Sequence, residues 1–344
     1  MEIKNFDNYK DKGLTGLANL GNTCFMNSTI QCISHTYELN NILKSGEYKK
    51  NLNKKPETLI LLEWDKLREL MWSENCVISP GGFLGIIQKI AKIKDKQIFT
   101  GFAQNDLPEF LLFLIDGFHN SINRGVEMKI NGKVENDIDK LAKMCYEMQC
   151  NMFKNDYSEI IKLFYGCHVS RILDCSDNLI SQTPEPFFLI NLPIPNKKNI
   201  NLMDCFDLYT DYEVMDGENQ WYNEKEEKHQ DIKKNILFFS LPHILVIDFK
   251  RFNNNMKKNN ALIDFPLENL DLSKYVIGYN KDEYKYDLYG ICNHSGNVMG
   301  GHYTAFVKNA NNKWYNFNDT KITEMRENKN VVTNQAYCLF YRKK

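Results

Sequence analysis

Hydrophobic residues recur at helical spacing through the first half of the chain and at strand spacing after about residue 165. We expect helices where apolar positions repeat every three or four residues or run nearly all round, at 24–33, 59–71, 110–118 and 141–152. Short β-rich runs follow at 186–193, 244–249, 286–292, 303–308, 313–317 and 336–342. Helices first and strands afterwards predict an α+β fold rather than a doubly wound parallel sheet.

Two polar stretches interrupt the strand-rich half of the chain. Residues 211–234 are rich in charged side chains, and residues 253–260 are rich in Asn and Lys. Such composition is typical of solvated loops or surface extensions. We therefore expect both stretches to lie on the solvated surface.

Composition and charge exclude several classes of protein. The 344 residues include 21 Phe, 18 Tyr and 4 Trp, which is too much core material for a disordered chain. A net charge of −1 gives no basic field for nucleic acid or an anionic membrane. No run approaches the ~20 apolar residues that span a bilayer, and the N-terminus lacks a signal core. We expect a monomer in the cytoplasm or nucleus, whose ten cysteines are thiols without any CxxC pair.

A cysteine at a turn-to-helix junction is the first candidate for chemistry. Cys24 follows a Gly-Asn-Thr turn at the start of an expected helix. Free backbone N–H groups and the helix dipole favour a thiolate there, and the same N–H groups can receive an oxyanion. A lone cysteine is more often a small buried hydrophobic residue, and that alternative stays open on this position alone.

The candidate base lies in the strand-rich half. His302 follows two glycines, which allow close approach of a substrate backbone, and the residues after it alternate as a strand. A hairpin centred between Ala310 and Asn311 places His302 opposite Asp319, or opposite Asn318 after a one-residue slip. A nucleophilic Cys, a His base and an orienting Asn or Asp form the papain-like constellation. A structural histidine beside a turn is the alternative.

Several long motifs, in a consistent order, resemble those of the ubiquitin-specific proteases. This family of papain-like deubiquitinases is built from thumb, palm and fingers subdomains. The motifs are Gly-Leu-Ala-Asn-Leu-Gly-Asn-Thr-Cys-Phe-Met-Asn-Ser at 16–28, Gln-Asn-Asp-Leu-Pro-Glu-Phe-Leu at 104–111, Leu-Pro-His-Ile-Leu-Val-Ile-Asp-Phe-Lys-Arg-Phe at 241–252, Gly-Gly-His-Tyr-Thr-Ala-Phe at 300–306 and Trp-Tyr-Asn-Phe-Asn-Asp at 314–319. The resemblance implies one catalytic domain over 14–342, with a helical thumb over about 14–155, β-rich fingers over about 156–190 and 205–245, and a palm sheet in the remainder.

The resemblance also implies catalytic roles by matched position. Cys24 is the nucleophile, and His302 is the general base and then the acid toward the leaving amine. Asn318 holds the third triad place, Asp319 the second acidic place, and Asn19 matches the side-chain donor to the oxyanion. The simple hairpin indicates Asp319 as the partner of His302, whereas the resemblance indicates Asn318. We follow the resemblance and predict Asn318.

Substrate contacts follow from the same matches. Asp106 and Glu109 stand where the family receives the Leu-Arg-Gly-Gly tail of ubiquitin, and carboxylates suit its arginine. Gly300 and Gly301 suit a slot too narrow for side chains around the terminal glycines. The further expected ubiquitin contacts are Gln104 and Tyr303.

The chain departs from the family pattern in the fingers. The family usually binds one zinc there through two CxxC pairs, whereas the matched positions here are Asp174, Asp177, Asn223 and Glu226. A different site could use another set of side chains, namely Cys167, His168, Cys175 and His229, although their spacing fits no known zinc knuckle. We expect no zinc and no other cofactor.

Three functions fit these residues. The first is a thiol hydrolase that cleaves after the C-terminal glycine of ubiquitin, with ubiquitin or ubiquitinated proteins as partners and no nucleic acid or membrane. The second is a hydrolase of another ubiquitin-like modifier, because acidic residues suit any tail that carries arginine. The third is a catalytically inactive ubiquitin-binding module, which the presence of Cys24, His302, Asn318 and Asn19 disfavours.

Overall fold

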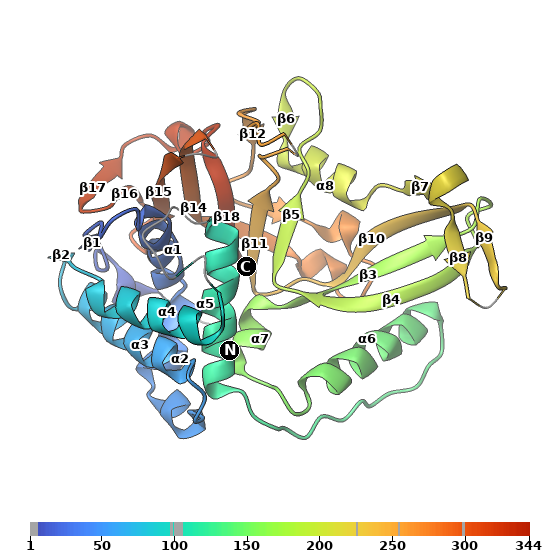
Figure 1. Cartoon of the computed structure of the whole chain (residues 1–344), viewed down its shortest axis with the longest axis horizontal. Coiled ribbons are helices and arrows are strands. Elements are labelled where there is room, and N and C mark those ends of the chain that lie inside the picture. Colours follow the sequence, from blue (N-terminus) through green and yellow to red (C-terminus); the bar gives the residue numbers. More distant parts are fainter. Residues whose placement is uncertain (1–5, 97–98, 100–105, 225, 254, 298–299) are drawn as a thin grey trace.

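A helical layer, an eight-stranded sheet and a projecting four-stranded sheet make up the fold (Figure 1). The computed structural model describes residues 6–96, 99, 106–224, 226–253, 255–297 and 300–344. This architecture confirms the predicted α+β class. None of the helices in the described ranges combines the length and apolarity needed to cross a membrane.

The helices gather mainly in the first half of the chain. They are α1 (Cys24–Ser34), α2 (Tyr37–Lys44), α3 (Thr58–Ser73), α4 (Gly81–Ile93), α5 (Leu107–Ile122), α6 (Asp137–Phe153), α7 (Glu159–Phe164) and α8 (Leu202–Thr210). The four predicted helices correspond to α1, α3, α5 and α6, and the periodicity did not reveal the other four. Every residue of α1 is buried, because this helix lies between α5 and the large sheet.

The large sheet supports one side of the helical layer (Figure 1). Its main strands run in the order β17 (Lys321–Met325), β16 (Trp314–Asn318), β15 (Gly300–Lys308), β14 (Lys285–Asn297), β18 (Ala336–Lys343), β11 (Ile244–Phe249) and β5 (Leu189–Leu192), and β13 (Leu270–Asp271) pairs with β14. Ile244 and Val246 join the core shared with the helices, and Leu245 and Ile247 join a second core on the other face. Both faces of β11 are therefore covered, which explains its unbroken apolar sequence.

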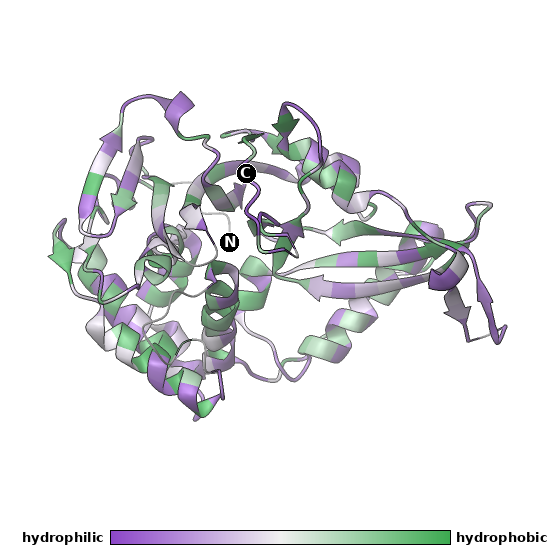
Figure 2. Ribbon diagram, turned by 45° about the horizontal axis from the view of Figure 1, so that its top comes forward, coloured by the Kyte–Doolittle hydropathy of each residue, from purple (hydrophilic) through white to green (hydrophobic). Residues whose placement is uncertain are grey.

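A second sheet projects from the rest of the molecule (Figure 1). Its order is β4 (Leu179–Phe187), β3 (Gly166–Leu173), β10 (Ile232–Ser240) and β7 (Glu213–Met215), and the hairpin β8 (Trp221–Asn223) and β9 (Lys228–Gln230) follows β7 in the chain. The hairpin is largely hydrophilic (Figure 2). Most of residues 211–234 are exposed, as expected for a solvated surface, but they form β7, β8, β9 and the start of β10 rather than a plain loop, because the strands of this thin sheet carry polar residues.

Two short parallel pairs complete the strands. β1 (Gly16–Leu17) pairs with β2 (Val77–Ile78), and β6 (Ile200–Asn201) pairs with β12 (Ile263–Asp264). Of the first pair, β1 precedes α1 in the chain, and residues 18–23 connect the two. This pair therefore fixes the segment that leads to Cys24.

The hairpin of β15 and β16 has a register that the sequence did not predict. Lys308 pairs with Trp314, whereas a turn centred between Ala310 and Asn311 would pair it with Lys313. The turn contains three residues, 310–312. Asn312 adopts φ 65°, and the N–H of Asn309 donates to the Lys313 carbonyl. A three-residue turn that ends in a left-handed residue is a common alternative to the two-residue turn.

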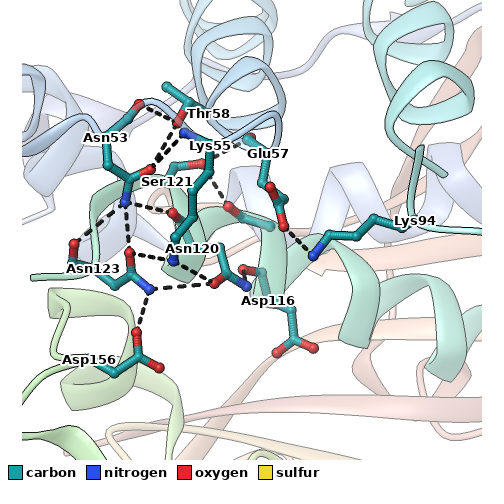
Figure 3. Close-up of polar contacts among 11 residues, drawn as sticks. Asn53, Lys55, Glu57, Thr58, Lys94, Asp116, Asn120, Ser121, Asn123 and Asp156 are labelled. Atoms are coloured by element: carbon teal, nitrogen blue, oxygen red, sulfur yellow. Dashed lines mark hydrogen bonds and ion pairs between the residues drawn. The ribbon is translucent and has the colours of Figure 1, made fainter. Parts of the chain in front are cut away.

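Polar side chains fix the C-terminal end of α5 (Figure 3). The Asn53 amide donates to the Asn120 carbonyl at 2.8 Å and to Asn123 Oδ1 at 2.7 Å, and the Thr58 hydroxyl donates to the Asn53 carbonyl at 2.8 Å. Asn123 in turn donates to the carboxylate of Asp156. These bonds join the start of α3, the end of α5 and the approach to α7, so α5 is held at the end opposite its N-terminus.

An ion pair in the core links the C-terminal strand to α2. Arg342 Nε donates to Glu38 Oε1 at 2.7 Å, and the guanidinium lies 4.4 Å from the ring centre of Tyr289 and 4.8 Å from that of Tyr37. Burial alone would raise the pKa of Glu38, but the charge of Arg342, with hydrogen bonds from His243 and Arg342, lowers it to about 2. The folded state therefore favours the ionised carboxylate.

We expect this pair to make stability fall in acid. A carboxyl whose pKa is depressed on folding stabilises the protein above its unfolded pKa of about 4.3, and that contribution is lost as the pH falls toward 2. The shift corresponds to about 3 kcal/mol. Urea unfolding at pH 6 and pH 3 should show a smaller pH-dependent loss for Glu38→Gln than for the unaltered chain. Equal losses in the two proteins would contradict this account.

Candidate active site

The thiol of Cys24 lies at the N-terminus of α1, as the turn before it requires. Asn19 Oδ1 accepts hydrogen bonds from the N–H groups of Gly21, at 3.1 Å, and Thr23, at 3.2 Å. These bonds close the turn, and the helix begins at Cys24. The helix α1 packs against β15, and the backbone N–H of Tyr303, the residue that follows His302, lowers the pKa of the Cys24 thiol.

His302 and Asn318 meet at the end of the β15–β16 hairpin. The Nε2 atom of His302 lies 2.7 Å from Oδ1 of Asn318. An amide oxygen can only accept, so Nε2 carries the proton of the neutral imidazole. Nδ1 is then left unprotonated and can take a proton from a thiol. Within the described residues no hydrogen bond joins that ring to Cys24, and such bonds often tighten only when substrate is bound.

Asp319 faces away from His302. Its backbone is left-handed, with φ 51°, and its carboxylate accepts from Asn19 Nδ2 at 3.0 Å and Asn27 Nδ2 at 2.8 Å. The simple hairpin predicted that His302 pairs directly with Asp319, and this prediction is wrong. The three-residue turn shifts the register by one residue, and Asp319 lies beyond the residues of β16 that pair with β15. The orienting role of Asn318 remains a prediction for kinetics.

Burial changes the expected chemistry of Cys24. The side chain is only 3% exposed, and this burial raises the pKa of the thiol. The nearby backbone N–H groups of Tyr303 and Phe25 lower the pKa, while the charge of Asp319 raises it. The net shift is upward: the backbone groups at the helix terminus lower the pKa, in the expected direction, but burial outweighs them. The resting side chain is a thiol that a base must deprotonate.

Asn19 keeps a hydrogen for an oxyanion. Its amide nitrogen donates one hydrogen to Asp319, and an amide nitrogen carries two. The residue is exposed at the mouth of the turn before α1. This geometry leaves Asn19 able to act as the predicted donor.

Two carboxylates lie at the N-terminus of α5. Asp106 is the N-cap residue and Glu109 lies in the first turn, and both are exposed. The hydroxyl of Tyr337 donates to Asp106 Oδ1 at 3.1 Å. Local desolvation and the charge of Glu109 raise the pKa of Asp106, against the effect of the Tyr337 bond. An incoming cation would relieve this repulsion. Gln104, the other predicted contact on this segment, lies outside the described residues.

The two glycines before His302 have different surroundings. A Cβ on Gly301 would lie 2.3 Å from Nε2 of His294 and 2.4 Å from the Ser295 carbonyl, so only glycine fits there. A Cβ on Gly300 would meet open space. Packing against β14 therefore requires Gly301, whatever it contributes to a substrate slot.

Tyr303 belongs to a cluster of aromatic rings behind the site. It is 6% exposed, and its ring centre lies 4.6 Å from that of His294 and 6.1 Å from that of Tyr337. Burial lowers the pKa of His294 to about 4, so this imidazole is neutral at pH 7. The cluster links the strand of His302 to Tyr337, the partner of Asp106.

The four positions that match the family's zinc ligands make other contacts. Asp174 Oδ1 accepts from the N–H of Asn178 at 2.8 Å within its own turn. Asp177 forms an ion pair with Lys233 at 2.8 Å, which joins the β3–β4 turn to β10. Asn223 Oδ1 accepts from the N–H of Glu226 at 3.4 Å. Local hydrogen bonds and one cross-strand ion pair thus hold these positions.

The side chains of the alternative zinc set contact groups in different parts of the chain. His168 pairs with Glu185, Cys175 contacts the Asp231 carbonyl and His229 contacts the Gln220 carbonyl. In the parts of the chain that the structure describes, no three His, Cys, Asp or Glu side chains lie close enough to hold a metal ion. The absence of zinc itself remains a prediction.

We expect chelator-washed protein to contain no stoichiometric zinc. Structural zinc needs four Cys or His ligands in a closed tetrahedron, and the matched positions offer carboxylates and an amide. Elemental analysis of the native protein measures this directly. One tightly held zinc per chain would show that the region of Cys167 and Cys175 contains a site that this account omits.

Some residues of the site were not predicted from the sequence. Tyr337 binds Asp106, His294 fills the space beside Gly301, and Asn27 binds Asp319. Of these residues, only Asn27 could have been identified from the sequence, because it follows Cys24 by three residues and so lies one helical turn away. The other two come from distant strands, and only the fold brings them to the site.

Comparisons with known proteins agree on one family. The family model described as ubiquitin carboxyl-terminal hydrolase matches residues 15–341. Ubiquitin carboxyl-terminal hydrolase 2 of Homo sapiens is 36% identical over 343 residues, covering 96% of this chain and 55% of the human protein. Ubiquitin carboxyl-terminal hydrolase 4 of Saccharomyces cerevisiae is 32% identical, covering 98% of this chain and 40% of the yeast protein. The chain thus spans about half the length of these relatives.

A solved structure extends the likeness to the fold. The SAGA Ubp8/Sgf11/Sus1/Sgf73 DUB module bound to ubiquitin aldehyde contains a chain that superposes with a TM-score of 0.73 at 25% identity. The match covers 100% of this chain and 72% of that one. The architecture in Figure 1 is therefore the papain-like fold of that group of proteases.

Proposed function

This chain belongs to the ubiquitin carboxyl-terminal hydrolase family, and from that premise we propose that it hydrolyses the peptide or isopeptide bond after the C-terminal glycine of ubiquitin. The observation that carries the proposal is the His302–Asn318 hydrogen bond beside α1, the helix that begins at Cys24 and packs against the strand of His302. A nucleophile, a base and an orienting amide at such a junction suit acyl transfer.

Acylation begins with proton transfer from the thiol. Nδ1 of His302 takes the proton of Cys24, and the sulfur attacks the carbonyl carbon of the terminal glycine. The oxyanion that forms receives hydrogen bonds from Asn19 Nδ2 and from backbone N–H groups at the start of α1. The imidazolium then protonates the leaving amine, which departs and leaves a thioester on Cys24.

Deacylation reverses the proton movements. Water attacks the thioester carbonyl while His302 accepts its proton, and the same donors stabilise the second oxyanion. The intermediate collapses with cleavage of its C–S bond, the imidazolium returns the proton to the sulfur of Cys24, and ubiquitin leaves with a free C-terminal carboxyl group. Asn318 holds the imidazole throughout without adding a negative charge, so it favours the imidazolium less than an aspartate would.

Asp106 and Glu109 are the proposed contacts for an arginine of the substrate tail. Their mutual repulsion at the N-terminus of α5 supports this role, because a guanidinium would neutralise it. The remaining proposed contacts are Gln104, Gly300, Gly301 and Tyr303.

Reversal of the charge at Asp106 should weaken substrate use. We expect Asp106→Arg to lower kcat/KM for a ubiquitin substrate by roughly 10- to 100-fold, mainly through KM, because two cations then face each other. Steady-state kinetics measures this. Asp137→Arg is the matched control, since Asp137 lies in the first turn of α6 and is also exposed. An unchanged kcat/KM in Asp106→Arg would show that this carboxylate does not meet the tail.

A panel of modifiers tests the proposed function. Ubiquitin and ubiquitin-like modifiers, each with a fluorogenic amine on the C-terminal glycine, are incubated with the purified chain. Release from ubiquitin alone, or much faster than from the others, is the expected result. Preferential release from another modifier would favour the second function, and binding of ubiquitin without any release would favour an inactive binding module.

A further inference from the structure

We propose that Asn27 is a positioning residue that acts through Asp319 to hold the amide of Asn19 in place beside Cys24. The inference rests on the proposed function, since it assigns a role within that reaction. It concerns a residue that touches neither the substrate nor the reacting atoms. Asn27 lies in the first part of α1, one turn beyond the nucleophile.

The Asn27 amide lies where three segments of the chain meet. It is 3% exposed, and its nitrogen donates to Asp319 Oδ1 at 2.8 Å, with longer contacts to the carbonyls of Leu17 and Ala18 at 3.4 and 3.3 Å. The N–H of Leu17 also donates to the Asp319 carbonyl at 2.9 Å. One amide therefore joins β1, α1 and the turn between β16 and β17.

The second oxygen of the same carboxylate holds Asn19. Asn19 Nδ2 donates to Asp319 Oδ2 at 3.0 Å, and its Oδ1 accepts from the turn that ends at Thr23. Asn27, Asp319 and Asn19 thus form one hydrogen-bonded chain that starts on the helix of Cys24 and returns to its N-terminus. Because bonds to a carboxylate are strong and directional, this chain fixes the distance between the oxyanion donor and the nucleophile.

Stability alone does not explain an asparagine at this position. Among the described residues, Oδ1 of Asn27 has no hydrogen-bond partner although the atom is buried. A buried acceptor without a partner destabilises the fold, so an apolar side chain would serve packing better. The bond from Nδ2 to Asp319 is what the asparagine provides. It also compensates part of the negative charge that raises the pKa of Cys24.

A double-mutant cycle separates positioning from structural support. We expect Asn27→Ala to lower kcat on fluorogenic ubiquitin by about 10²-fold with KM nearly unchanged, since small misplacements of reacting groups have effects of this size. In an Asn19→Ala background, the same change should lower kcat by no more than about threefold, because the group that Asn27 positions is already absent. An equal loss in both backgrounds would overturn the proposal.

Exchanging the two side chains that are hydrogen-bonded to each other, at positions 27 and 319, provides a second test. Unlike Asn27→Ala, this exchange leaves no cavity in the fold. Asn27→Asp places two carboxylates together and should also lower kcat. Adding Asp319→Asn restores the chain, because an amide at 319 can accept from Asn19 and donate to the carboxylate at 27. We expect this pair of changes to recover at least tenfold in kcat over Asn27→Asp alone. No recovery in a folded double variant would overturn the proposal, whereas an inactive unaltered chain would instead refute the proposed function.

Discussion

Cys24→Ala is expected to lower hydrolysis of a fluorogenic ubiquitin substrate by at least about four orders of magnitude. The change removes the sulfur atom that forms the thioester. Because this position is buried, a water molecule cannot occupy it and act as the nucleophile instead. Affinity for ubiquitin should remain, since the side chain is small and 3% exposed. Steady-state kinetics gives the loss in rate, and binding to unmodified ubiquitin gives the affinity.

Cys175→Ala is the matched control for this change. Cys175 is an exposed thiol in the turn between β3 and β4, and this turn lies at the end of the projecting sheet that points away from α1 (Figure 1). Its loss should leave kcat unaltered. Substantial activity in Cys24→Ala, or loss of activity in Cys175→Ala, would move the nucleophile away from α1.

The second large effect is expected at Asn318. Asn318→Ala should lower kcat by about 10²-fold with a smaller change in KM, because His302 then loses the acceptor that fixes its ring and its tautomer. Kinetics at substrate saturation measures the loss. Asn318→Asp keeps an acceptor at this position and should retain most of the activity.

Thr320→Ala is a suitable control, because Thr320 is exposed near the same turn and its backbone, rather than its side chain, packs against Gly16. Asp319→Ala is also expected to be severe, through Asn19 and Asn27 rather than through His302. If Asn318→Ala retains full kcat, the third triad position has been misassigned.

The sequence predicted the deeply buried elements, because burial determines how their hydrophobic residues are spaced. The strand at 244–249 and the start of α1 at Cys24 agree with their predicted bounds, because both are buried and have clear signals at their ends. The approximate meeting of His302 with the end of β16 was also predictable, since a hairpin connects them.

The remaining features depend on contacts that a linear pattern does not contain. The register of the hairpin depends on one left-handed residue, Asn312, which the sequence permits but does not require. The strands within 211–234 are too exposed to show an apolar alternation. The raised pKa of Cys24 results from burial against β15, and this opposes the effect that its helical position alone suggests.

The central claim is that Cys24 attacks the carbonyl carbon of the last glycine of ubiquitin. Ubiquitin with an electrophile in place of that carbonyl traps the attacking sulfur, and peptide mapping by mass spectrometry identifies it among the ten cysteines. The account predicts one ubiquitin per chain, attached at Cys24. Attachment at any other cysteine, or no adduct with folded protein, would contradict it.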